Sequence, residues 1–122
     1  MNAIENYFAG REKLDNAYYA EAIEFFKASV ELDQHFKPYE CLYRCYAALN
    51  EPEKAFESIS AAYRLNSKND KVALGYAKAL AIYKKDIAAA RGVLSEILKR
   101  NPTYKPAERM LKDLSKNEKD EV

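Results

Sequence analysis

The sequence predicts an all-α protein made of helical hairpins that follow one another along the chain. Apolar residues recur at the spacing of one buried helix face, which favours amphipathic helices. The same pattern returns twice more, with steps of 33 residues from Ala22 to Ala55 and 35 from Ala55 to Ala90. Only three Gly and four Pro occur in 122 residues, which leaves little material for the many turns of a β protein. We therefore expect three hairpins and about seven helices.

The second helix of each hairpin shows the repeat most clearly. These helices are expected over residues 19–33, 52–66 and 87–101. Each carries a small residue, then a large apolar residue four positions later, then a third inward position after three more. The three sets are Ala22, Phe26 and Ser29; Ala55, Ile59 and Ala62; and Ala90, Leu94 and Ile97.

A first helix precedes each of these segments. In the second hairpin, the positions i, i+3, i+4 and i+7 hold Tyr39, Leu42, Tyr43 and Tyr46. The third hairpin repeats the pattern more weakly, with Leu74, Ala77, Lys78 and Ala81. Short breaks at residues 15–17, 50–51 and 84–86 leave room only for tight antiparallel turns.

A helical hairpin of about 34 residues with a small residue early in its second helix resembles the tetratricopeptide repeat (TPR). The resemblance covers about residues 3–114, and its carriers are Gly10, Tyr19, Ala22, Phe26, Ala55, Ile59, Ala90, Leu94 and Pro102. Four positions depart from the family pattern, namely Lys13, Gln34, Ser67 and Lys78. The resemblance implies a right-handed α-solenoid, with one TPR domain over residues 1–114 and repeats at about 3–35, 36–69 and 70–103.

A repeat array needs a cover on its last apolar face. Residues 104–116 can supply it as a capping helix, because Ala107, Met110, Leu111 and Leu114 fall on one side. From residue 115 to residue 122 the chain is polar except for its last residue, so we expect a frayed tail there.

Charge and composition exclude several kinds of partner. The formal net charge is +1, which provides no long-range field for nucleic acid or an anionic membrane. No stretch has the roughly 18 apolar residues of a membrane span, and the first residues do not have the pattern of a secretory signal. Cys41 and Cys45 are the only cysteines, and their helical spacing suits reduced thiols better than a disulfide. We expect a cytoplasmic protein.

Residues for catalysis or cofactor binding are scarce. His35 is the only histidine, and no phosphate-binding, dinucleotide-binding or hydrolase motif is present. Cys41, Cys45 and His35 form a poor metal site, because the two thiols have no C-x-x-C spacing. The acidic residues alternate with Lys and Arg at helix-face spacing, which is typical of solvated surfaces. We expect no enzyme activity, no cofactor and no metal.

The resemblance implies a concave groove lined by the first helices, which holds a peptide or helix of another protein. The equivalent positions here are Tyr7, Arg11, Leu14, Glu40, Arg44, Ala48, Gly75, Ala79, Ile82 and Tyr83, with Glu108 and Lys112 at the end. Some members of the family grip the C-terminal carboxylates of heat-shock chaperones. The positions that do so hold Tyr7, Arg11, Cys41, Val72 and Tyr76 here, of which only Arg11 can donate to a carboxylate. That function is therefore not expected.

Arg11 and Arg44 occupy equivalent places 33 residues apart, so they are predicted to hold an acidic group of the partner together. The alternative is that each arginine pairs on its own helix, Arg44 with Glu40 and Arg11 with Asp15. A peptide-binding adaptor or scaffold is the leading hypothesis. A secretion or assembly chaperone and a self-associating structural protein are the other two.

Overall fold

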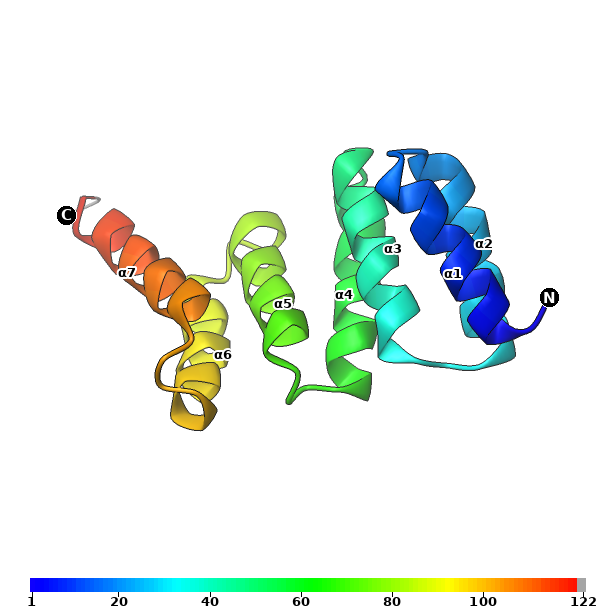
Figure 1. Cartoon of the computed structure of the whole chain (residues 1–122). Helices are drawn as coiled ribbons and strands as arrows, with labels where there is room; N and C mark the ends of the chain where they lie inside the picture. The colour runs from blue at the N-terminus through cyan, green and yellow to red at the C-terminus, as the bar shows by residue number, and fades with distance from the viewer. Residues whose placement is uncertain (121–122) are drawn as a thin grey trace. The chain divides into compact units, whose positions relative to one another are not determined.

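The computed structural model describes residues 1–120, with side chains described through residue 116. Within them the chain forms α-helices and no strand, which confirms the predicted fold class (Figure 1). The helices are α1 Ala3–Asp15, α2 Tyr19–Leu32, α3 Phe36–Ala48, α4 Pro52–Leu65, α5 Asp70–Tyr83, α6 Ile87–Arg100 and α7 Lys105–Asp120. The predicted breaks inside the three hairpins are all present. None of these helices combines the length and apolarity that a membrane crossing requires.

The helices group into two compact units. Unit 1 is Met1–Asn66 and holds α1 to α4, and unit 2 is Ser67–Val122 and holds α5 to α7. In unit 1 the hairpins α1–α2 and α3–α4 are joined by contacts of α3 with α2 and α1. In unit 2 the hairpin α5–α6 is followed by α7, which packs on α6 as a capping helix is expected to do.

The turn inside each hairpin uses the same backbone device. One residue in each turn has a left-handed conformation, with φ of 62° at Ala17, 57° at Asn50 and 56° at Lys85. These residues are 33 and 35 positions apart, which equals the spacing of the small residues in the second helices. The backbone conformation of the turns therefore repeats with the same period as the side chains.

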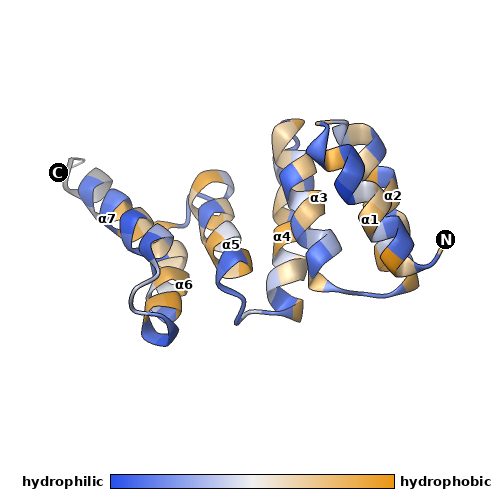
Figure 2. Cartoon of the chain, viewed as in Figure 1, coloured by the Kyte–Doolittle hydropathy of each residue, from blue (hydrophilic) through white to orange (hydrophobic). Residues whose placement is uncertain are grey.

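Unit 1 is built around a core of large side chains. Leu14, Ile23, Phe26 and Leu42 are buried in one cluster with Ala22, Cys41 and Cys45, and four tyrosines pack around it. Phe26 lies against Gly10, where an added Cβ would come within 2.7 Å of the Phe26 ring. A glycine at position 10 is therefore required by the close approach of α1 to α2. Figure 2 shows the apolar and polar residues distributed along these helices.

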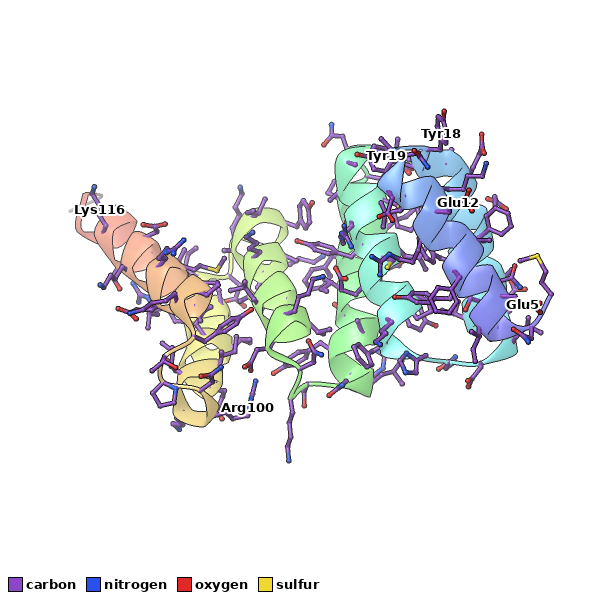
Figure 3. All side chains as sticks on the ribbon, in the orientation of Figure 1. Glu5, Glu12, Tyr18, Tyr19, Arg100 and Lys116 are labelled. Atoms are coloured by element: carbon purple, nitrogen blue, oxygen red, sulfur yellow. The ribbon has the colours of Figure 1, made fainter. Side chains whose placement is uncertain are left out.

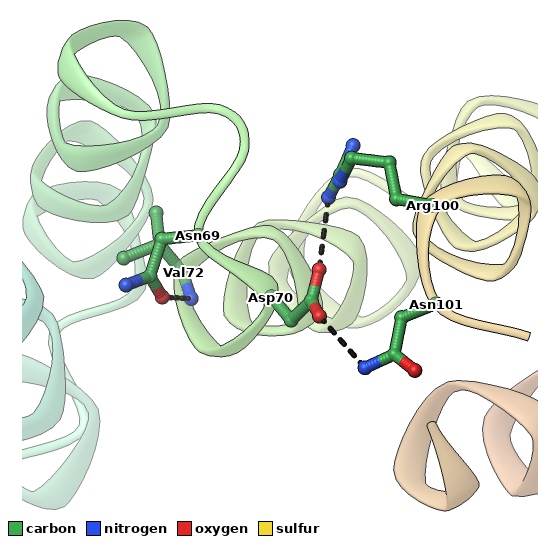
Figure 4. A network of polar contacts seen from close by, with 5 residues as sticks. All are labelled: Asn69, Asp70, Val72, Arg100 and Asn101. Atoms are coloured by element: carbon green, nitrogen blue, oxygen red, sulfur yellow. Dashed lines mark hydrogen bonds and ion pairs between the residues drawn. The ribbon is translucent and has the colours of Figure 1, made fainter. Parts of the chain in front are cut away.

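Unit 2 has a core of smaller side chains and a polar clamp. Its buried apolar residues are Val72, Ala73, Ala77, Ala79, Leu80, Ala90, Leu94, Ile97 and Ala107. The Asn69 side chain caps α5 by accepting from the Val72 N–H at 3.0 Å. Asp70 accepts from Arg100 Nη2 at 3.1 Å and from Asn101 Nδ2 at 3.2 Å (Figure 4). These bonds tie the start of α5 to the end of α6.

The capping helix is longer than expected. It was predicted over 104–116 with a frayed tail from 115, whereas α7 continues to Asp120. Residues 105–120 contain several lysines and glutamates, which have high helix propensity, so a polar segment can extend a helix that packing has started. The last two residues of the predicted tail, 121 and 122, lie outside the described residues.

Candidate partner-binding surface

The residues predicted to face a partner lie on the first helix of each hairpin. In unit 1 they are Tyr7, Arg11 and Leu14 on α1 and Glu40, Arg44 and Ala48 on α3. In unit 2 they are Gly75, Ala79, Ile82 and Tyr83 on α5, with Glu108 and Lys112 on α7. Each helix begins where a local signal places it, since Asn2 forms a capping box with Glu5 at α1 and His35 caps α3 through the Lys37 N–H.

Arg11 is held in place by the tyrosine one turn before it. Its Nη1 donates to the Tyr7 hydroxyl at 3.1 Å, and its guanidinium carbon lies 6.0 Å from the centre of the Tyr7 ring. The hydrogen bond with Tyr7 raises the pKa of Arg11, with smaller contributions from Cys41 and Asp15. Arg11 therefore contacts a phenol, and among the described residues it forms no ion pair with Asp15 or another carboxylate.

The Nε atom of Arg11 adds a further feature. It is shielded from solvent and has no hydrogen-bond partner among the described residues. A buried N–H without an acceptor is unfavourable, and a ligand oxygen can bond it only after the side chain moves, because the atom is closed to solvent. The Arg11 guanidinium is therefore positioned by Tyr7 while part of its donor capacity is unused.

Arg44 lies near Glu40 on its own helix, as the alternative prediction stated. Its Nη1 lies 3.9 Å from Glu40 Oε1, which is the predicted pair within α3. This distance is at the limit of an ion pair, and 40% of the Arg44 side chain is exposed, so the pair contributes little to stability. The guanidinium has other donors, and Arg44 can bond a partner while it stays near Glu40.

The two cysteines lie on α3 and belong to the buried cluster of unit 1. Neither forms a disulfide, and both are buried. Burial raises the pKa of Cys45 to about 11, and the neighbouring Cys41 adds to the effect. Cys45 is therefore a packing residue at neutral pH, because its reactive thiolate is disfavoured. No group of three metal-ligating side chains is found within the described part of the chain.

The remaining predicted residues differ in accessibility. Leu14 and Ala79 are buried, and Leu14 belongs to the core of unit 1. Ala48 and Ile82 are exposed, while Gly75 and Tyr83 are half-buried. In this conformation Leu14 and Ala79 therefore pack inside their units and are not accessible to a partner. Contact of the other residues with a partner stays a prediction.

Sequence reasoning missed a pocket beside Tyr7. It has a volume of about 290 Å³ and lies where the start of α1 meets the end of α2 and the start of α3. Its lining residues are Ala3, Ile4, Tyr7, Phe8, Ser29, Asp33, His35, Lys37 and Pro38. The signal that could have found it is the exposed pair Ile4 and Phe8, one helical turn apart on the first helix.

Solved structures of other proteins have the same arrangement of helices. The second TPR domain of human RPAP3, in complex with an HSP70 peptide, matches with a TM-score of 0.82 and 19% identity over 93% of this chain and 94% of that one. The fold is that of a tetratricopeptide-repeat domain. The Yersinia enterocolitica type III secretion chaperone SycD, in complex with a peptide of the translocator YopD, matches with a TM-score of 0.81 and 18% identity over 93% and 92%.

Yeast Tom70 matches at 25% identity and a TM-score of 0.78 over 98% of this chain, which covers 26% of Tom70. No protein-family model and no curated protein matches the sequence. The TPR fold is therefore visible in the arrangement of the helices, although sequence identity to these structures is low.

Proposed function

We propose that this chain is a protein-interaction module that binds a peptide segment or helix of a partner protein through its first helices. The observation that carries the proposal is Arg11, whose guanidinium is oriented by Tyr7 and makes one side-chain hydrogen bond among the described residues. Because the side chain is already ordered, little conformational entropy is lost when a ligand oxygen binds it. The solved structures of this fold that hold HSP70 and YopD peptides support the same use.

The ligand group that fits Arg11 and Arg44 is a carboxylate. A guanidinium presents paired N–H donors in a plane, which matches the two oxygens of an acidic side chain or a chain terminus. Arg11 supplies the ordered cation, and Arg44 on the neighbouring first helix supplies a second one with a weak partner. Tyr7 and the exposed Ala48 offer apolar contact beside them.

Recognition in the manner of the chaperone-binding TPR domains is not proposed. Two of the positions that would supply donors hold Cys41 and Val72, and each is only 1% exposed. Neither can reach a carboxylate. The proposed acidic group is therefore bound by fewer donors and by a different set of residues than in those domains.

We also propose that the chain performs no chemical step. His35 is occupied in capping α3, and the raised pKa of Cys45 opposes a thiolate nucleophile. A chaperone for a secreted or assembling client is the second candidate function. The match to SycD with its translocator peptide favours it, because a client segment would use the same surface.

A binding titration tests the proposal. The partner is isolated by co-purification from the native host and titrated against wild type, Arg11→Ala, Arg44→Ala and the double variant. Charge-assisted hydrogen bonds contribute about 1.5–3 kcal/mol, so each single change is expected to weaken binding roughly tenfold to a hundredfold. Arg64→Ala on α4 is the matched control, since Arg64 is an exposed arginine on a second helix. Arginine variants that bind as tightly as this control contradict the proposal.

A further inference from the structure

One end of unit 1 carries large apolar side chains that no described residue covers. Phe8 on α1 is 63% exposed and Leu32 on α2 is 60% exposed. Further residues at helical spacing lie on the same sides of α1 and α2, so that each helix carries one stripe of this surface. We call this surface the end face, and it consists of Glu5, Phe8, Ala9 and Glu12 on α1 and Glu21, Phe25, Ala28 and Leu32 on α2.

Most of the end face points away from α3, and Phe8 at its edge also borders the pocket that the start of α3 lines. In the core, α1 uses Leu14 and α2 uses Ile23 to pack in the cluster that contains the α3 side chains. At about 100° per residue, Glu5, Phe8 and Glu12 lie roughly 120–180° around α1 from Leu14. Phe25, Ala28 and Leu32 lie roughly 140–180° around α2 from Ile23. Glu5 and Glu12 are labelled on α1 in Figure 3.

The equivalent positions in the second hairpin show what kind of element packs on this surface. Adding 33 residues to Glu5, Phe8, Ala9 and Glu12 leads to Pro38, Cys41, Leu42 and Cys45 on α3. All four are buried, and α2 packs on α3 with Ile23 in the same cluster as Cys41 and Leu42. These positions of a first helix are therefore where the repeat receives another helix. In the first hairpin the same positions are open.

The charges on the end face select among possible occupants. Glu5 and Glu12 lie on either side of Phe8, whereas their equivalents on α3 are uncharged. Glu21 is paired with Lys13 at 3.1 Å, and Glu5 Oε1 accepts from the Asn2 N–H. Glu12 has no ion pair among the described residues. On α1, Glu5 and Glu12 thus border the apolar centre with negative charge that no described residue neutralises by an ion pair, whereas the charge of Glu21 is paired.

We propose that the end face docks an amphipathic helix of a partner protein, with an apolar stripe over Phe8 and Leu32 and with lysine or arginine residues beside Glu5 and Glu12. The apolar stripe follows from the helix-accepting geometry of these positions, and the basic flanks follow from charge complementarity. A second copy docked by the same face would place glutamates against glutamates, which is unfavourable. The site is separate from the proposed carboxylate site and does not depend on it.

Two synthetic peptides test this proposal directly. Both are about 18 residues long, or five helical turns, with one leucine stripe. One has lysines beside the stripe, and the other has glutamates at the same positions. Fluorescence anisotropy with labelled peptide is expected to show at least about tenfold tighter binding of the lysine peptide.

Variants locate the peptide on the end face. Phe8→Ser combined with Leu32→Ser is expected to weaken binding of the lysine peptide about tenfold or more, and Glu12→Lys is expected to abolish the preference between the peptides. The matched controls are Leu65→Ser and Glu24→Lys, which alter an exposed leucine and an exposed glutamate elsewhere in unit 1. Circular dichroism confirms that each variant is folded. Arg11→Ala with Arg44→Ala is expected to leave this binding unchanged, which separates it from the carboxylate site.

Three results would overturn the proposal. Equal binding of both peptides would show that charge does not select the occupant. Binding by the Phe8 and Leu32 variant at the affinity of its control would place the peptide elsewhere. Dimerisation of the wild type in sedimentation velocity that is lost in this variant would identify a second copy as the occupant.

Discussion

The two units have the same hairpin architecture but different stabilising interactions. All five phenylalanines and seven of the ten tyrosines lie in unit 1, where Phe26 is part of a buried cluster and four tyrosines pack against it. Unit 2 has eight alanines and no phenylalanine, and it links α5 to α6 through Asp70, Arg100 and Asn101. The backbone repeat therefore does not require one kind of core. The stability of unit 1 should be most sensitive to loss of side-chain volume in its core. The stability of unit 2 should also depend on the polar contact between α5 and α6.

The largest effect is expected from Phe26→Ala in unit 1. Phe26 is fully buried and its ring fills the space left by Gly10, so the change should leave a cavity. The free energy of unfolding should fall by about 3–5 kcal/mol, against about 2–5 kcal/mol for Leu94→Ala in unit 2. Urea denaturation gives the totals, and hydrogen exchange assigns each loss to a unit.

Exchange of unit 2 amides is the internal control for this pair. Phe26→Ala should accelerate exchange in α1 to α4 and leave α5 to α7 nearly unchanged, with the reverse for Leu94→Ala. Equal acceleration in both units would mean that they unfold as one cooperative body, and the comparison between them would lose its basis.

Overpacking should give the next largest effect, because Ala55 is completely buried where α3 and α4 are packed together. Ala55→Leu is expected to lower the free energy of unfolding by about 1–3 kcal/mol. Ala90→Leu makes the equivalent change in unit 2, and Ala20→Leu on the exposed side of α2 is the control. A denaturation midpoint in Ala55→Leu equal to that of the control would show that the helices can separate at this point without cost.

The burial of the alanines in the second helices could be predicted from the sequence, because the close packing that requires a small residue recurs once in each repeat. Ala22, Ala55 and Ala90 are all fully buried, as their spacing required, and so are Phe26, Ile59 and Leu94. The turns were also predictable in position. Their left-handed residues were not, since Ala17 and Lys85 are poor candidates for positive φ and are held there by the helices on either side.

The candidate site was less accessible to sequence reasoning. Spacing placed Arg11 on the correct helix, but the choice between Asp15 and Tyr7 as its contact depends on rotamers, and both residues are four positions away. The Arg44–Glu40 pair was predicted as an alternative and is present. Phe8 was missed because the repeat pattern gives its position a buried role. Only the structure shows that Phe8 is exposed in the first hairpin and that none of the described residues covers it.

A pH titration sharpens the contrast, because unit 2 has no cysteine. The pKa of Cys45 is about 11 in the folded chain against an ordinary value of 9.0, so the folded state retains the proton longer than the unfolded state. Stability should therefore fall as pH rises between about 9 and 11, by about 1 kcal/mol near pH 10. The measurement is the difference between wild type and Cys45→Ala at pH 7 and pH 10. A constant difference would show that the thiol is not desolvated.

The smallest effect is expected at the polar clamp of unit 2. Asp70 lies in the first turn of α5 and Arg100 in the last turn of α6, so each charge also favours the dipole of its own helix. Asp70→Asn removes the charge and keeps an acceptor, and the free energy of unfolding should fall by about 0.5–1 kcal/mol. Asp113→Asn on the exposed side of α7 is the matched control.

The ion pair of Lys13 with Glu21 in unit 1 serves as a comparison for this clamp. Measuring both pairs at low and high salt concentration shows whether the clamp stabilises unit 2 by electrostatic attraction. The Asp70 and Arg100 side chains are 25% and 31% exposed, whereas Lys13 and Glu21 in unit 1 are 36% and 62% exposed at the same distance of 3.1 Å. Glu21→Gln should therefore cost less than Asp70→Asn, and high salt should reduce both losses, more completely for Glu21. If Asp70→Asn is neutral at low salt while Glu21→Gln is costly, polar contacts matter more in the unit with the large apolar core. The distinction drawn between the two units would then be reversed.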